Sequence, residues 1–238
     1  MEKLEFYLLG KEKLKKEANN EGLQTLKAPD LFPKSFICLL IGKPGSGKTT
    51  LIEEMLINPV LLNNQFDFIF IFSPNELKNI PCIQNENYSN IWDISIIYKL
   101  IDKINAETDK KYTNNEKINN INLLIIFDDF ISEMKKEAIN PLFTKLFYNR
   151  RHLLKNGCIS FIITAQKFTI TPFQIRPCIN SLILFRLNNS EYNSIKKDIC
   201  SWIETNVFSK SLSNEYDFLL INLSNGKIYL NMQTMISS

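Results

Sequence analysis

Residues 42–49 read Gly-Lys-Pro-Gly-Ser-Gly-Lys-Thr, and this spacing of glycines, lysine and hydroxyl is typical of a loop that binds a polyphosphate. The glycines let backbone N–H groups turn toward phosphate oxygens, and the helix expected after the loop adds the positive end of its dipole. Lys48 is expected to reach the β- and γ-phosphates of ATP, and the Thr49 hydroxyl to coordinate Mg²⁺. The expected nucleotide contacts are Gly42, Pro44, Gly45, Ser46, Gly47, Lys48, Thr49 and Thr50.

Two carboxylates follow the apolar run at residues 121–127. Asp128 is expected to hold Mg²⁺, directly or through water, and Asp129 to orient and deprotonate an attacking water. Asp129 is one methylene shorter than the glutamate that most ATPases of this layout carry at the second position. A pair of solvated acids at a strand end is the alternative interpretation of both residues.

A further apolar run, residues 158–164, leads to Gln166. P-loop ATPases that hydrolyse with water present a polar sensor near the γ-phosphate from such a strand, so Gln166 is expected to fill that role. An ordinary polar residue at the end of a strand is the alternative.

Arginine is rare and clustered in this chain. Lys and Arg together number 28, and the only arginines are Arg150, Arg151, Arg176 and Arg186. A planar guanidinium can bind phosphate in a bidentate manner, whereas lysine acts as a point charge. The cluster therefore predicts that arginines bind phosphate, either as an arginine finger that reaches the nucleotide of a neighbouring subunit or as contacts to the DNA backbone. Salt bridges within the fold are the alternative for each arginine.

Apolar runs alternate with helix-like segments, and this order indicates a parallel sheet with helices on both faces. The expected strands are residues 35–41, 66–74, 121–127, 158–164 and 181–185. The expected helices are residues 49–57, 94–104, 141–154 and 191–205, with a surface loop over residues 105–120. Asn225-Gly226 predicts a hairpin turn between residues 217–223 and 227–231. The predicted fold class is α/β, with a mostly parallel central sheet flanked by helices and a C-terminal β-hairpin.

Three parts of the chain follow from this pattern. Residues 1–34 are expected to form an N-terminal extension with a solvated helix near Lys11–Glu17. Residues 35–190 are expected to form the ATPase core, and residues 191–238 a helix and hairpin packed on that core.

Composition restricts the class of protein further. The chain is 45% hydrophobic and 22% charged, as expected of a soluble globular protein, and its apolar runs are too short to span a bilayer. Its N-terminus does not read as a signal peptide. Five cysteines without a CxxC pair support neither a zinc site nor a disulfide framework, which favours a reducing, intracellular compartment. The net charge of +3 permits nucleic acid as a partner without requiring it.

Together these motifs resemble the DNA-packaging ATPases of poxviruses, other large cytoplasmic DNA viruses and virophages, which belong to the FtsK–HerA superfamily of P-loop motors. The resemblance covers about residues 30–190, and its most specific part is YNRRHLLKNGCISFIITAQ, residues 148–166. It implies a RecA-like, ASCE-type P-loop fold. It also implies that Lys48, Thr49, Asp128 and Asp129 bind nucleotide and metal, that Gln166 is the sensor, and that Arg150 or Arg151, then Arg176, supplies the finger.

The same resemblance implies partners and a location. A ring of identical subunits would use ATP and Mg²⁺ to drive double-stranded DNA into a preformed capsid. A protein of the capsid vertex or portal would hold the ring. The ATPase would be located in the host cytoplasm or viral factory and would associate with the virion. Candidate DNA contacts are Lys135-Lys136, Lys196-Lys197 and the N-terminal lysines, although such charge runs are more often solvated faces.

Two other functions remain open from the sequence. A nucleoside or nucleotide kinase would need a mobile lid with several arginines, and it would leave the Asp128-Asp129 pair idle. An ATP-dependent switch protein, such as a helicase loader, would bind ATP tightly with negligible turnover. Phosphorylation of a nucleoside panel identifies the first alternative, and a DNA-stimulated ATPase rate argues against the second.

Overall fold

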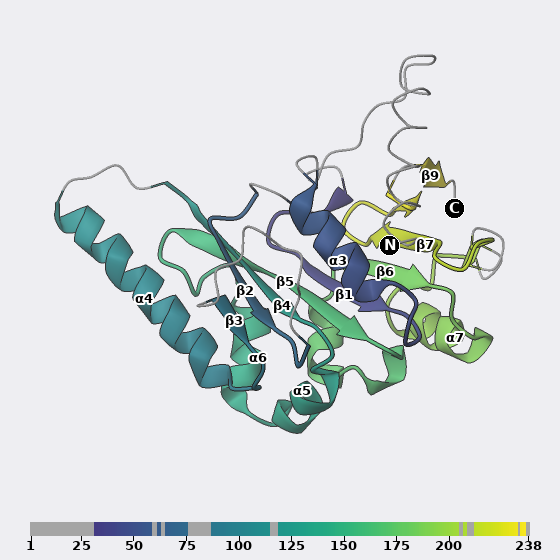
Figure 1. Cartoon of the computed structure of the whole chain (residues 1–238), viewed down its shortest axis with the longest axis horizontal. Coiled ribbons are helices and arrows are strands. Elements are labelled where there is room, and N and C mark those ends of the chain that lie inside the picture. The colour runs from purple at the N-terminus through teal and green to yellow at the C-terminus, as the bar shows by residue number, and fades with distance from the viewer. Residues whose placement is uncertain are drawn as a thin grey trace, which may run out of the picture.

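A nine-stranded sheet organises the part of the chain that the computed structural model describes: residues 31–58, 61–62, 65–75, 87–114, 119–204, 207–208, 212–232 and 234–236. The strand order is β3-β2-β4-β5-β1-β6-β7-β8-β9 (Figure 1). The strands from β3 to β6 in this order are parallel, and β7, β8 and β9 are added antiparallel. The strands are β1 Ile37–Ile41, β2 Phe68–Phe72, β3 Tyr88–Ser89, β4 Ile121–Phe127, β5 Gly157–Ala165, β6 Ser181–Phe185, β7 Phe218–Asn222, β8 Lys227–Leu230 and β9 Thr234–Ile236.

Helices cover both faces of this sheet. They are α3 Lys48–Ile57, α4 Ile94–Thr113, α5 Ile131–Glu137, α6 Pro141–Tyr148 and α7 Asn189–Asp198, with short 3₁₀ turns η2 Phe168–Ile170 and η3 Phe173–Cys178. Side chains that alternate along the strands divide the core into two clusters. Leu40 and its equivalents pack against α3 on one face, while Leu39 and its equivalents pack against α4, α5, α6 and α7 on the other. All five residues of β1 are buried, as expected of a parallel strand covered on both sides.

The predicted fold class is confirmed, including the antiparallel C-terminal strands. The turn between β7 and β8 contains Gly226 at φ 71, a left-handed conformation that costs glycine nothing. Because β7 pairs directly with β6 in the register Leu184↔Leu219, the hairpin continues the core sheet.

Three of the four predicted helices end at a different residue from the one predicted. Residues 105–113 belong to α4 and not to a loop, because Ile101, Ile104 and Thr108 continue the buried stripe of that helix. The helix expected over 141–154 ends at Tyr148, and the one expected over 191–205 spans Asn189–Asp198.

The first part of the chain is described only from Leu31 onward. Leu31 and Phe32 are buried in the core beside α3, so this stretch joins the body of the fold. The helix expected at Lys11–Glu17 and the N-terminal lysines lie outside the described residues. Among the described helices, none combines the length and apolar character needed to cross a membrane.

Candidate active site

The phosphate-binding loop lies between β1 and α3, at the carboxyl edge of the parallel strands. Its first backbone N–H, that of Gly42, donates a hydrogen bond of 3.1 Å to the carbonyl oxygen of Ala165 at the end of β5. Gly45 and Gly47 have φ of 77° and 93°, and only glycine adopts this left-handed region without strain. The glycine spacing seen in the sequence is therefore what lets the chain turn tightly and enter α3 at Lys48.

Lys48 lies across the mouth of this loop. Its Nζ donates hydrogen bonds to the carbonyl oxygens of Gly42 at 2.8 Å and Lys43 at 3.0 Å. Partial burial lowers the pKa of the Lys48 ammonium, and the carboxylates of Asp128 and Asp129 oppose that shift. The structure thus brings together the lysine and both acids that the sequence singled out.

Asp128 is held between two threonine hydroxyls. Thr49 Oγ1 donates to Asp128 Oδ2 at 3.0 Å, and Thr164 Oγ1 donates to Asp128 Oδ1 at 2.9 Å. Asp128 as a whole is only 4% exposed. Burial raises the pKa of Asp128, and the hydrogen bonds from Thr164 and Thr49 act against that rise. The carboxylate is therefore fixed in place and poorly solvated, which favours pairing with a cation.

Asp129 follows in an unusual backbone conformation. Its φ of 59° lies in the left-handed region, which is uncommon for a residue other than glycine. Its N–H donates to Thr164 Oγ1 at 2.8 Å, and its side chain is exposed. One hydroxyl, that of Thr164, thus ties the two acids together and directs Asp129 outward.

The sequence did not assign a role to Thr164. It lies one step beyond the Phe127↔Ile163 pair of the β4–β5 ladder, directly beside Asp128. The order of strands supplies the missing signal, because β5 lies between β1 and β4 and its tip must contact both. Gln166 follows the same tip, exposed and next to the carbonyl that holds Gly42, so the structure places the predicted sensor at the loop.

The first two arginines lie at the opposite edge of the sheet. Arg150 and Arg151 precede β5, and the nine residues of that strand separate them from Gln166 by about 30 Å at a rise of ~3.3 Å per residue. Arg150 is 8% exposed; its Nε donates to Ser35 O at 3.0 Å and its Nη1 to Phe147 O at 3.1 Å. The expectation that Arg150 could act as a finger is corrected here, because its guanidinium is buried against carbonyls of its own chain. Arg151 is exposed.

The other two arginines bind neighbouring parts of their own chain. Arg176 pairs with Asp198 at 2.7 Å and lies over the Phe168 ring at 4.6 Å from its centroid. Arg186 follows β6 and donates to the carbonyls of Leu212 and Ser213. Arg150, Arg176 and Arg186 are therefore each engaged by groups of their own chain.

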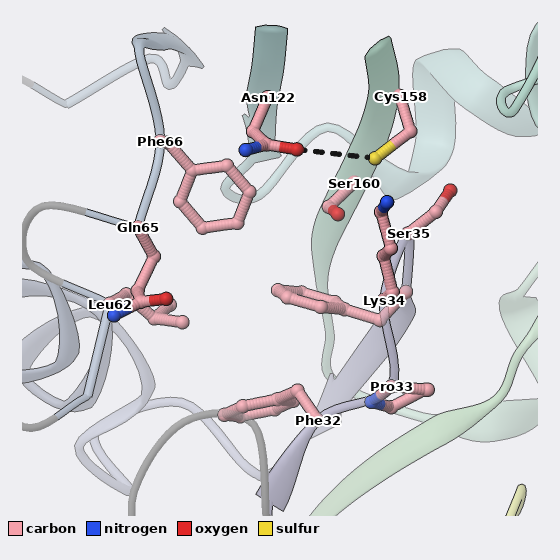
Figure 2. A pocket seen from close by; sticks show the side chains of 11 residues that line it. Phe32, Pro33, Lys34, Ser35, Leu62, Gln65, Phe66, Asn122, Cys158 and Ser160 are labelled. Carbon is pink, nitrogen blue, oxygen red and sulfur yellow. Dashed lines mark hydrogen bonds between the residues drawn. The ribbon is translucent and has the colours of Figure 1, made fainter. Parts of the chain in front are cut away.

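A pocket of about 390 Å³ lies beside the first residues of β4 and β5, at the edge of the sheet opposite the phosphate-binding loop. Figure 2 shows the side chains that line it. Phe32, Phe36 and Phe66 supply much of its wall. Cys158 also lines the pocket, and its Sγ donates to Asn122 Oδ1 at 3.4 Å. Burial raises the pKa of the Cys158 thiol. The pocket shares no residue with the predicted nucleotide site.

The donor set of the site fits Mg²⁺. In the described part of the chain, no group of three or more His, Cys, Asp or Glu side chains forms a metal cage. Mg²⁺ is usually held by one or two protein oxygens, with phosphate and water oxygens completing the octahedron. Asp128 and Thr49, whose oxygens lie 3.0 Å apart, supply such a pair beside the loop.

Comparisons with known proteins agree with this geometry. A family model described as Poxvirus A32 protein matches residues 24–222. No curated protein matches significantly. Among solved structures, the genome packaging NTPase B204 from Sulfolobus turreted icosahedral virus 2 with ATP-gammaS is 19% identical, has a TM-score of 0.57, and aligns over 82% of this chain and 96% of that one. The DNA-packaging ATPase B204 from Sulfolobus turreted icosahedral virus is 20% identical, with a TM-score of 0.58 over 86% and 99%.

Proposed function

Because this chain belongs to the poxvirus A32 protein family, whose model matches most of its length, we propose that it is an ATP-hydrolysing motor that drives double-stranded viral DNA into a capsid during virion assembly. One observation supports ATP hydrolysis by this chain. Lys48, Thr49, Asp128 and Asp129 meet at a single edge of the sheet, with the strand of Gln166 between the two strands that supply them. The structures with the same fold include genome packaging NTPases solved with nucleotide analogues, which supports ATP as the ligand.

The loop holds the phosphates in this proposal. Its backbone N–H groups and the first turn of α3, including Thr50, bind phosphate oxygens, and Lys48 moves from the carbonyls of Gly42 and Lys43 onto the β- and γ-phosphates. Thr49 and Asp128 hold Mg²⁺, which when bound neutralises charge on the β- and γ-phosphate oxygens. A cation held by Asp128 would offset part of the cost of burying the ionised carboxylate.

Asp129 positions the attacking water. Its carboxylate is exposed beside the loop and, in this proposal, accepts the water proton as the water oxygen bonds to the γ-phosphorus. The bond from that phosphorus to the β–γ bridging oxygen breaks, and the products are ADP and phosphate. Gln166 hydrogen-bonds the γ-phosphate and reports its loss to the end of β5.

A ring of identical subunits completes the site. Arg151 is exposed at the edge away from its own loop, so it is available only to a neighbouring molecule, and we assign it as the finger that acts in trans. The ring encloses double-stranded DNA and engages a protein of the capsid vertex or portal, in the host cytoplasm or viral factory and on the assembling virion.

ATP turnover with and without duplex DNA tests the proposal. Wild-type protein is expected to release phosphate from MgATP faster when DNA is added. The Lys48→Ala variant should lose nucleotide binding or turnover, and Asp129→Asn should bind MgATP but fail to hydrolyse it. Transfer of phosphate to a nucleoside would instead identify a kinase. Tight binding with negligible turnover, with or without DNA, would identify a switch protein.

A further inference from the structure

An aromatic ring outside the predicted motifs lies against the phosphate-binding loop. Tyr216, in the loop that precedes β7, places its Cδ1 atom 3.6 Å from the position that a β-carbon would take on Gly47. Phe185, the last residue of β6, places its Cε1 atom 4.0 Å from the same point. Two rings from different segments therefore flank the loop where α3 begins.

The position of Tyr216 is fixed by its neighbour Asp217. Asp217 is 7% exposed, and its carboxylate accepts hydrogen bonds from Asn214 N at 2.7 Å, Ser213 Oγ at 3.2 Å and Asn231 Nδ2 at 3.0 Å. Burial alone would raise the pKa of Asp217, but these hydrogen bonds, led by that from Asn231, outweigh it and the pKa is lowered. The turn is thus built around an ionised side chain.

Arg186 ties the other end of this turn to the sheet. It follows Phe185 at the tip of β6 and donates to the carbonyls of Leu212 and Ser213. The segment that carries Tyr216 is therefore bound on both sides, to the end of β6 through Arg186 and to the turn after β8 through the hydrogen bond between Asp217 and Asn231. A ring held in this way loses little rotational freedom when it stacks on a ligand.

The order of strands gives the direction in which a nucleotide must lie. The acids that meet the terminal phosphoryl group, Asp128 and Asp129, follow β4, which lies beyond β5 on one side of β1. β6 and β7 lie on the other side of β1. A nucleotide with its γ-phosphate toward the acids therefore extends its nucleoside toward β6 and β7, where Tyr216 lies.

We propose that Tyr216 stacks on the nucleobase of the bound nucleotide and favours purine over pyrimidine nucleotides. This inference rests on the proposed function, because it needs a nucleotide in the loop. Aromatic stacking tolerates any base, since every base has a π-face, and its strength grows with the ring area in contact. Tyr216 accordingly contributes affinity and a preference for the larger ring system.

Binding of two ligands that both place phosphates in the loop, only one of which carries a nucleoside, tests this role. Calorimetry compares MgADP with Mg-tripolyphosphate, which fills the loop but has no base. Tyr216→Ala is expected to weaken MgADP binding about 10-fold, the effect of losing one base–aromatic stack, and to leave tripolyphosphate binding unchanged. Tyr216→Phe keeps the ring and should bind both ligands as the wild type does. Tyr112→Ala removes an exposed tyrosine from α4 and is the matched control.

Each outcome has a clear meaning. An equal loss of affinity for both ligands in Tyr216→Ala would show that the ring only supports the loop, and would overturn the inference alone. Unchanged MgADP affinity would overturn it as well. Failure of the wild type to bind either ligand would overturn the proposed function and this inference with it. As a spectroscopic check, etheno-ADP fluorescence should be quenched on binding to wild type and not on binding to Tyr216→Ala.

Discussion

Replacing Thr164 by valine removes one hydroxyl from between the two acids and keeps the shape of the side chain. Thr164 is 1% exposed, so water cannot take the place of the lost group easily. Its Oγ1 donates to Asp128 Oδ1 at 2.9 Å and accepts from Asp129 N at 2.8 Å. Both contacts disappear in the variant, and the strained backbone of Asp129 loses its tether.

The two contacts set the size of the effect. A hydrogen bond to a charged group contributes about 1.5–3 kcal/mol, and an N–H left without a partner costs about 1–3 kcal/mol, at the low end here because Asp129 is near solvent. We expect Thr164→Val to lower the free energy of unfolding by about 2–4 kcal/mol. The loss should shrink as the pH falls through the pKa of Asp128, which burial raises above its ordinary value, because the Thr164 hydrogen bond stabilises only the ionised form.

Denaturant unfolding and ATP turnover measure these two consequences. We expect kcat to fall about 10- to 100-fold, since displacement of a reacting group by ~1 Å can cost that much. Thr164→Ser keeps the hydroxyl and is the matched control, with a loss of about 1 kcal/mol for the missing methyl and near-normal kcat. A Thr164→Val protein with wild-type kcat and stability would refute the argument that this hydroxyl positions the acids.

Three further predictions concern other parts of the fold. Asp128→Asn should abolish Mg²⁺-dependent turnover. It should also stabilise the nucleotide-free protein at pH 7 by about 1 kcal/mol, because the raised pKa of Asp128 means that its ionised form destabilises the fold. This gain in stability should vanish below about pH 4, where Asp is protonated in the unfolded chain, and thermal unfolding across pH measures it. Gly157→Ala should destabilise the protein by about 2–4 kcal/mol, because the new β-carbon would lie 1.9 Å from the carbonyl oxygen of Ile121; wild-type stability in denaturant would contradict this. Arg151→Ala subunits mixed with Lys48→Ala subunits should regain part of the ATPase activity that each lacks alone, and no recovery would assign Arg151 a role within its own subunit.

The core strands could be predicted from the sequence because a parallel strand buried on both faces reads as an unbroken apolar run. β4 and β6 have the predicted bounds, Ile121–Phe127 and Ser181–Phe185. The second half of α4 could not be predicted in this way, because residues 105–113 are mostly polar and Thr108, which is buried against the core, is polar too. A helix with one narrow buried stripe resembles a surface loop in composition.

The sequence identifies candidate site residues, but which of them lie close together depends on the order of the strands. Lys48, Thr49 and Asp128 come together because each follows or begins an element at the same edge of the sheet. Arg151 and Gln166 are close in the sequence, but β5 runs between them and carries them to opposite edges. Thr164 could not be identified because the residues it contacts, Asp128 and Asp129, are distant in the sequence. A threonine inside a strand belongs to no motif, and its role depends on which strand lies beside it.

Strand displacement from a triplex is a direct test of ATP-driven movement along DNA. A third DNA strand bound to a duplex is released only when a motor moves along that duplex, so release that depends on ATP reports translocation and hydrolysis together. The wild type should displace the third strand with ATP and Mg²⁺, while Lys48→Ala and Asp129→Asn should not. DNA-stimulated hydrolysis by the wild type with the third strand left in place, or release that persists in Lys48→Ala, would contradict the account.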